Sequence, residues 1–444
     1  MTEILLLMAL GLTTILVIVV TEKSTGFLNI RNLSVMGFFA LTYSLNIVGG
    51  ILVFFQRQDV SDGIRYSYLA MIFLGFIGIC IGSVLISMWK HFDPEETKKF
   101  LSSDFKTCMP VYGIFPSVLI IIGLAGLIFI AYSRILPSLP IAYLLSSDID
   151  AVMLKLVRAS GYKTLPNYIT HPMNFIRMVL FPYLIVLTFL LVHKFRTNRL
   201  RALFMVTFLS GIVFNSYTTA LFPVVMLFAI LLLAFWITRS IKIRHLPLIL
   251  SGALAFPLLS AILAHRSIEI SSVVTKEIIR HLLRFIYEIP DILLSYVTLY
   301  WDAGSRLMGS AHRPLSILLG QESLNVSNIV FLYRNPSGYY LGNASAPFVG
   351  HLYADFGLWG VFTGAIITGI ILQGVHIYCV RRENNLFNLA LYIMVIWAGF
   401  ATTSTNITTG LLSKGLIPVL FLPFIMKIVC GFWERVGGKN CHAY

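Results

Sequence analysis

The chain has 444 residues, of which 57% are hydrophobic and only 12% are charged, and its formal net charge is +14 at pH 7. Soluble domains carry about 25% charged residues, so this composition excludes a soluble enzyme and a disordered chain. It also excludes a nucleic-acid-binding protein, because too little polar surface is left to cover a globule. We therefore expect an all-α polytopic membrane protein that forms a single integral membrane domain over residues 1–444.

Eleven apolar runs approach the roughly 20 residues that a bilayer-spanning helix needs. They cover about 4–20, 33–55, 66–88, 112–132, 175–194, 200–214, 217–237, 245–264, 355–380, 386–405 and 412–433. Lys and Arg gather in the loops after the third, fifth, seventh and ninth runs. Because basic loops stay in the cytoplasm, we expect an exterior N-terminus and a cytoplasmic C-terminus.

Two exterior loops, at about 133–174 and 265–354, are far longer than ordinary connections. In the first we expect a short amphipathic helix over about 147–159. Asp148 and Asp150 at its start resemble a cation-binding pair, but acidic residues are also favoured at helix N-termini. Five cysteines occur without a Cys-x-x-Cys pair, so no metal site is predicted. In the second loop, residues 281–300 are semi-apolar and predict a helix that lies at the interface or re-enters the membrane.

Arginine dominates the basic residues of the loop 265–354, where it supplies six of seven. A guanidinium pairs bidentately with phosphate oxygens and stays charged at any relevant pH. This pattern predicts a site for a lipid-linked diphosphate, and the open alternative is a solvated loop whose arginines pair with its acidic residues. The predicted diphosphate-binding residues are Arg280, Arg284, Arg313, Arg266, Arg306 and Arg334 in this loop and Arg158 in the loop 133–174. Arg280 and Arg284 would share a helix face, and Pro314 would fix the backbone beside Arg313.

The polar segment 343–360 enters the helix that follows this loop. His351 and Asp355 lie four residues apart at the mouth of that helix, and an ionisable residue at a membrane edge is a candidate functional group. The alternatives are a histidine anchored at the interface and an N-terminal helix charge. Tyr339, Tyr340 and Asn343 precede them and are candidate sugar-binding residues, although tyrosines also form membrane-interface belts.

These features resemble the Wzy-type O-antigen polymerases, the family of oligosaccharide repeat-unit polymerases of bacterial inner membranes. In hydropathy the resemblance covers the whole chain, with a large exterior loop in the C-terminal half and three spans after it. In residues it rests on Arg313-Pro314 and on Asn343-Ala344-Ser345-Ala346-Pro347-Phe348-Val349-Gly350-His351-Leu352-Tyr353-Ala354-Asp355-Phe356-Gly357-Leu358-Trp359-Gly360. The arginine that many members carry after a short exterior turn is missing from Asn215-Ser216-Tyr217-Thr218-Thr219.

The resemblance implies a multi-span, GT-C-like glycosyltransferase whose active site faces the periplasm. It would polymerise undecaprenyl-diphosphate-linked oligosaccharide repeat units within the inner membrane, without a metal or other cofactor, and a chain-length regulator would be a further partner. Cationic groups would stabilise the leaving diphosphate, and a base would accept the proton of the attacking hydroxyl. The candidate catalytic bases are His351, Asp355 and Asp302, in that order.

Two other functions stay open. An O-antigen ligase would transfer the same glycan to lipid A core, but that family carries a histidine where this chain has Ser345 and Ala346. A transporter or flippase for lipid-linked glycans would need polar residues within its spans and related halves, whereas the spans here are nearly uncharged.

Overall fold

The computed structural model describes residues 2–29, 32–106, 111–135, 167–216, 221–238, 284–336, 342–413 and 415–436. Every regular element within these ranges is a helix. The chain divides into two compact units. Unit 1 contains residues 1–102, 278–381 and 395–411, and unit 2 contains residues 103–277, 382–394 and 412–444.

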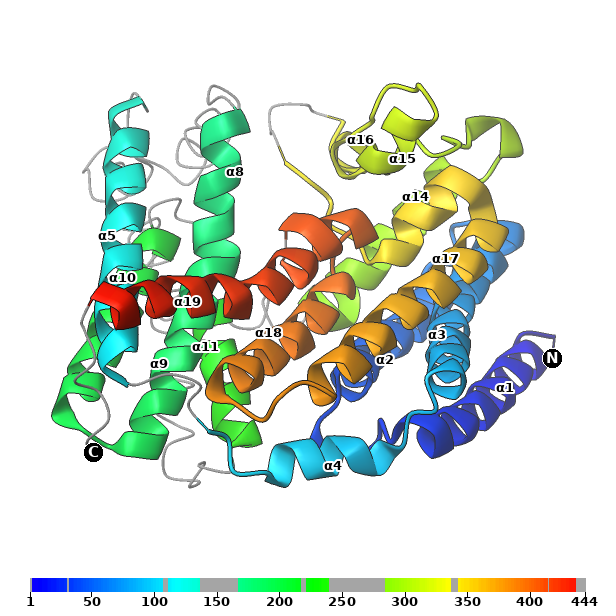
Figure 1. Ribbon diagram of the computed structural model, residues 1–444. Helices are drawn as coiled ribbons and strands as arrows, with labels where there is room; N and C mark the ends of the chain where they lie inside the picture. The colour runs from blue at the N-terminus through cyan, green and yellow to red at the C-terminus, as the bar shows by residue number, and fades with distance from the viewer. Residues whose placement is uncertain are drawn as a thin grey trace, which may run out of the picture. The chain divides into compact units, whose positions relative to one another are not determined.

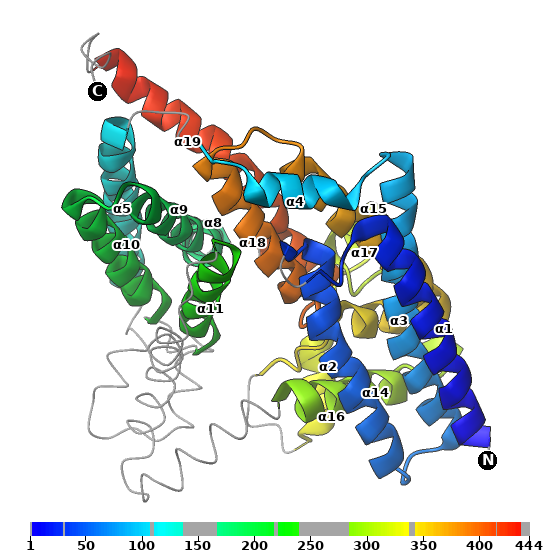
Figure 2. The same ribbon diagram turned by 90° about the horizontal axis from the view of Figure 1, so that it is seen from below.

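Figure 1 labels the α-helices of unit 1. Its helices are α1 (Thr2–Thr25), α2 (Val35–Gln56), α3 (Asp62–Trp89), α4 (Pro94–Ser102), η4 (Arg284–Glu288), α14 (Ile289–Leu299), η5 (Ala303–Ser305), α15 (Arg313–Leu318), α16 (Val326–Arg334) and α17 (Phe348–Val380). Helix α14 lies beside α2 in Figure 2, and it also packs against α3 and α17.

Helices α3 and α17 form the most extensive helix–helix packing in unit 1. Glycines bring their backbones together, because a Cβ atom on Gly82 would collide with the carbonyl oxygen of Ile366 and one on Gly369 with that of Ile79. Side chains of α2 complete this core, where Phe39, Tyr43 and Phe348 form an aromatic cluster. Close helix packing through small residues is typical of membrane proteins.

Helix α17 is interrupted at Gly357, whose backbone angles are φ 66° and ψ −155°. This conformation is accessible almost only to glycine. It separates a short first segment, residues 348–356, from a longer second segment, residues 358–380. The first segment carries His351 and Asp355, so both lie inside a helix that begins seven residues before the predicted span.

Unit 2 contains α5 (Val111–Ile135), α8 (Asn167–Phe175), η2 (Ile176–Leu180), α9 (Phe181–Phe195), α10 (Asn198–Ser216), α11 (Leu221–Ile237) and α19 (Leu416–Val436). Helix α18 (Leu386–Thr402) and the π-helical turn η6 (Thr409–Ser413) contribute residues to both units. One core of unit 2 gathers Tyr132, Met173, Phe181 and Phe214 from four different elements. These side chains are apolar in keeping with a helical membrane bundle.

Seven described helices are long and apolar enough to cross a membrane, and two further apolar helices are shorter. Ten of the eleven predicted runs coincide with helices of the structure, whereas the run 245–264 lies outside the described residues. Helix α10 occupies the sixth run without being among the apolar helices of either kind. The chain is therefore an all-helical, multi-pass membrane protein.

The helix predicted over 281–300 corresponds to η4 and α14. Together η4 and α14 cover residues 284–299 of the described chain, which is shorter than the roughly 20 residues of a spanning helix. Most side chains of α14 are buried against the neighbouring helices of unit 1. The predicted amphipathic helix at 147–159 lies outside the described residues.

Candidate functional site

The candidate site lies in unit 1, where the segment between α14 and α16 meets the start of α17. The fully buried Asp355 carboxylate accepts two hydrogen bonds from this segment. The backbone N–H of Ala311 donates to Oδ1 over 3.0 Å, and Nδ1 of His312 lies 2.7 Å from Oδ2. Two more backbone bonds hold the segment, since Leu307 N–H donates to the Ala354 carbonyl and Met308 N–H to that of Asp355.

His312 is oriented by this contact. Because a carboxylate only accepts hydrogen bonds, Nδ1 carries the proton and a neutral imidazole then has its lone pair on Nε2. Nε2 is buried and has no hydrogen-bond partner among the described residues. A histidine whose Nδ1 is held by a buried carboxylate, with Nε2 unpaired, has the arrangement of a general base.

A second histidine lies close by. The ring centroids of His312 and His351 are 6.3 Å apart. Nε2 of His351 lies 3.4 Å from the Tyr296 hydroxyl and 3.5 Å from the Ser327 hydroxyl. The Tyr296 hydroxyl donates to the Ala344 carbonyl over 3.2 Å, so His351 Nε2 is the donor toward it. Nδ1 of His351 is then the lone-pair nitrogen, and it too is buried without a partner in the described part of the chain.

Burial raises the pKa of Tyr296 well above its ordinary value, and the hydrogen bond with Ser327 offsets this only in part. Tyr296 therefore stays protonated over the physiological range and keeps its role as a donor. Tyr296 lies on α14, and its hydroxyl contacts Ser327 at the start of α16 and His351 at the start of α17. This network fixes the ring of His351 beside His312.

Two arginines near His312 and His351 lack an acidic partner among the described residues. The Arg306 guanidinium stacks on the Tyr353 ring, 4.2 Å from its centroid, and donates to the carbonyl oxygens of Tyr353 and Trp301. It also covers Gly357, where a Cβ atom would lie 3.4 Å from its central carbon. Arg313 follows His312 directly and is exposed. Both positive charges remain available for an anion.

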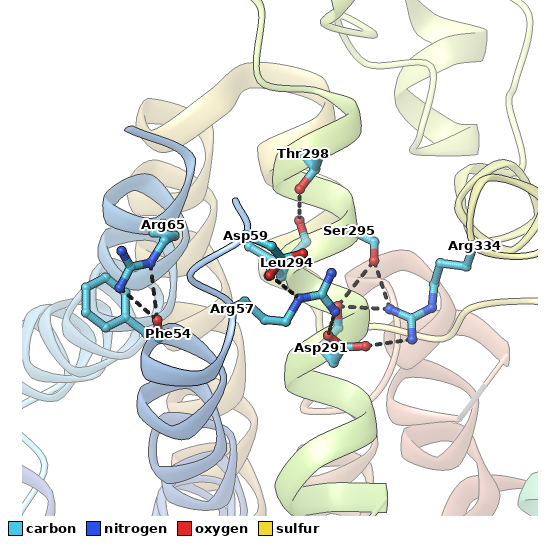
Figure 3. Close-up of polar contacts among 9 residues, drawn as sticks. All are labelled: Phe54, Arg57, Asp59, Arg65, Asp291, Leu294, Ser295, Thr298 and Arg334. Atoms are coloured by element: carbon cyan, nitrogen blue, oxygen red, sulfur yellow. Dashed lines mark hydrogen bonds and ion pairs between the residues drawn. The ribbon is translucent and has the colours of Figure 1, made fainter. Parts of the chain in front are cut away.

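Arg334 is engaged differently (Figure 3). Its Nη2 lies 2.7 Å from Oδ2 of Asp291, and its Nη1 donates to the Asp291 carbonyl and to the Ser295 hydroxyl. Arg57, at the end of α2, approaches the same carboxylate from the other side, with Nη1 3.0 Å from Oδ1. Arg57 also pairs with Asp59. The two guanidiniums face two carboxylates, so this cluster is neutral and ties α2, α14 and α16 together.

The structure brings some predicted site residues together and leaves others apart. His351 and Asp355 converge with His312. Asp302 is exposed, and within the described ranges it makes no contact with His312, His351 or Asp355. Asn343 is exposed and accepts a hydrogen bond from the Asn325 side chain. Arg284 begins η4. The remaining predicted residues lie outside the described residues, and these are Arg158, Arg266, Arg280, Tyr339 and Tyr340.

Sequence reasoning missed His312, although it stands directly before the Arg313-Pro314 pair on which the resemblance rests. That adjacency was the only available signal. It also missed Asn406, whose side-chain amide donates to the Ala311 carbonyl over 3.0 Å from 95 positions later in the chain. No group of three or more His, Cys, Asp or Glu side chains in the described part of the chain is arranged to hold a metal ion.

Comparison of the chain with protein-family models, with curated protein sequences and with solved structures finds no match.

Proposed function

We propose that this chain polymerises undecaprenyl-diphosphate-linked oligosaccharide repeat units into a surface polysaccharide such as O-antigen, by glycosyl transfer at the outer face of a bacterial inner membrane. The resemblance in the segments around Arg313 and His351 supports the family. The observation that carries the chemistry is the His312–Asp355 contact, because it pairs an oriented imidazole with an adjacent, uncompensated arginine.

In the proposed reaction, a hydroxyl oxygen of the acceptor attacks the anomeric carbon of the donor glycan. The bond from that carbon to the lipid diphosphate breaks, and its electron pair leaves with the diphosphate. Nε2 of His312 accepts the hydroxyl proton, while Asp355 stabilises the resulting imidazolium. Arg306 and Arg313 stabilise the negative charge on the leaving diphosphate. Since Nε2 is buried in this structure, the proposal requires that the groups covering Nε2 move aside when substrate binds, while the His312–Asp355 contact stays in place.

His351 binds the acceptor in this proposal. Its Nδ1 is unpaired beside His312 and can accept a hydrogen bond from a second hydroxyl of the acceptor sugar, while the attacking hydroxyl donates to His312. This ranks His312 ahead of His351, Asp355 and Asp302 as the base. Asp355 instead acts through His312, and Asp302, which is exposed, has no role in the step.

The proposed topology has eleven crossings, with the N-terminus in the periplasm and the C-terminus in the cytoplasm. It places α14, α15, α16 and the first segment of α17 on the periplasmic side, where lipid-linked repeat units are joined. The large exterior loop 265–354 then supplies His312 and both available arginines. The GT-C-like architecture and a chain-length regulator belong to the same proposal.

The decisive experiment is incubation of the purified protein with lipid-diphosphate-linked repeat units alone. A ladder of polymers supports a polymerase. Glycan transfer only after lipid A core is added would instead identify a ligase and overturn the proposal. A His312→Gln variant should form no ladder, whereas His171→Gln, at an exposed position of α8, is the matched control and should form a normal one.

A further inference from the structure

A cluster of exposed apolar side chains projects from the segment 307–319. It consists of Met308, Ile317, Leu318 and Leu319, and the side chains of Ile317 and Leu318 are 69% and 81% exposed. Single exposed apolar residues are common on soluble surfaces, but a contiguous group marks a binding surface. The segment lies outside the candidate membrane spans, so its apolar face requires a partner.

The backbone conformation of the segment 307–319 keeps these apolar side chains on the outside. Gly309 has φ 107°, and a Cβ atom there would collide with Leu319 and crowd Leu315, so the chain turns tightly beneath α15. The opposite side of α15 carries Ser316, which is fully buried. Bonds from Leu307 and Met308 to the α17 backbone hold the base of the segment. These contacts hold the segment in an orientation in which Ile317 and Leu318 are exposed.

Helix α17 indicates where the membrane surface lies relative to this segment. Trp359 is 80% exposed, and Tyr378, near the other end of the helix, is also exposed. The two residues are 19 positions apart, which corresponds to about 28 Å along a helix and is close to the thickness of the hydrocarbon core. Aromatic side chains gather at both interfaces. The segment is bonded to Ala354 and Asp355, next to the Trp359 end, and so lies at the level of one interface.

The charge at the start of α15 fits the same surface. Arg313 is exposed and has no ion pair within the described ranges. An arginine beside an apolar face can pair with phosphate groups while its stem and neighbours contact lipid chains. The first acidic residue after α15 is Glu322, beyond the turn at Gly320.

We propose that α15 is an interfacial helix that inserts Ile317 and Leu318 into the adjacent leaflet of the membrane that α17 crosses. Arg313 then lies in the phosphate layer. This inference rests on the multi-pass membrane assignment and does not depend on glycosyl transfer. It explains why a short exterior helix exposes Ile317 and Leu318 and buries Ser316.

The test uses the full chain in phosphatidylcholine vesicles, with a bimane label on Leu318→Cys. Ile317→Cys is a second, independent position, and Glu322→Cys is the matched exposed control. Labelled wild type gives the background from native cysteines, of which Cys80 and Cys379 are buried. Size-exclusion chromatography checks that each variant folds as the wild type does.

We expect lipids brominated in their acyl chains to quench the labels at 317 and 318 several-fold more than the label at 322. Iodide in the aqueous phase should show the reverse order. Iodide quenching at 317 and 318 that equals that at 322 would show a solvated loop and overturn the proposal. Labels at 317 and 318 that neither quencher reaches would show that another protein surface covers them, which also overturns it.

Discussion

Nδ1 of His312 lies 2.7 Å from the carboxylate of Asp355, although the two residues are 43 positions apart in the chain. Asp355 has no exposed surface, and a buried carboxylate is costly unless donors surround it. The Ala311 N–H and the His312 imidazole supply those donors. The contact therefore has two roles. It anchors the exterior segment to α17, and it sets the tautomer of His312.

The first prediction concerns Asp355→Asn. The amide is similar in size but can donate to Nδ1, which favours the tautomer with the proton on Nε2 and removes the base. We expect polymer formation to fall by about 10²–10⁴-fold, while the amount of protein in the membrane stays near normal. Ladder formation by purified variant and wild type measures the loss. A variant that polymerises at the wild-type rate would refute the role of the pair.

The sequence could predict most of the helices, but of the His312–Asp355 contact it indicated only Asp355. Apolar runs locate α2, α3 and α17 because a spanning helix must bury its length in lipid. His351 and Asp355 are noticeable as ionisable residues at a helix mouth. His312, in contrast, lies in a polar segment, and its partner is defined only by the turn that begins at Leu307. Long-range pairing of this kind leaves no local pattern.

The same reason explains why the predicted arginines could not be sorted from the sequence. The residues next to Arg306, Arg313 and Arg334 in the chain do not show whether each arginine meets an acidic residue. The structure distinguishes them by partners that are distant in sequence, since Arg334 meets Asp291 and the Asp291 carboxylate is shared with Arg57. Arg313 keeps its charge free in the described part of the chain. The chemistry of guanidinium predicts a site of this type but not which arginines form it.

The second prediction separates Arg313 from the structural arginines. Arg313→Ala removes an exposed side chain, so the free energy of unfolding should change by less than about 0.5 kcal/mol. Loss of one cationic group from the leaving diphosphate should lower the rate of polymer formation by about 10²-fold. Thermal unfolding in detergent and the ladder assay measure the two effects. Arg313→Lys keeps the charge and should recover part of the activity, and full activity of Arg313→Ala would exclude Arg313 from the diphosphate site.

The third prediction concerns Arg334→Ala, which should show the opposite pattern. It removes hydrogen bonds to Asp291 and Ser295 and leaves the Asp291 carboxylate to Arg57 alone. Because the guanidinium is partly buried, we expect the protein to lose about 1–3 kcal/mol of stability. Polymer formation at low temperature, where the variant remains folded, should be nearly unchanged. A strong loss of activity without a lower melting temperature would place Arg334 in the substrate site instead.

The fourth prediction concerns the interruption of α17. Gly357→Ala introduces a side chain at φ 66° and ψ −155°, a conformation that costs an L-residue about 1–3 kcal/mol. The added methyl would meet the Arg306 guanidinium at an ordinary contact distance of 3.4 Å, so the expected cost comes from the backbone conformation. Gly374→Ala is the matched control, because it lies within the regular part of the same helix and a Cβ atom there meets only an ordinary contact. The control should be neutral or slightly stabilising. Equal melting temperatures for the two variants would mean that the strain at Gly357 is absent.

The fifth prediction concerns pH and the contact between α4 and the end of α17. Arg381 donates two hydrogen bonds to Glu96, over 2.7 Å and 2.8 Å. These bonds lower the pKa of the Glu96 carboxyl below its ordinary value, although burial acts against them. A carboxyl whose pKa is lowered by folding stabilises the folded state above the ordinary glutamate range. That contribution is lost as the pH falls through the lowered pKa.

The melting temperature of the wild type should therefore exceed that of Glu96→Gln at neutral pH, and the difference should shrink on acidification. The pair is partly exposed, so high salt should reduce the difference as well. Glu95→Gln, one position earlier on α4, is the control, because Glu95 is exposed and pairs only with exposed Lys98 among the described residues. A difference between wild type and Glu96→Gln that does not vary with pH would show that the Arg381 contact does not stabilise the fold.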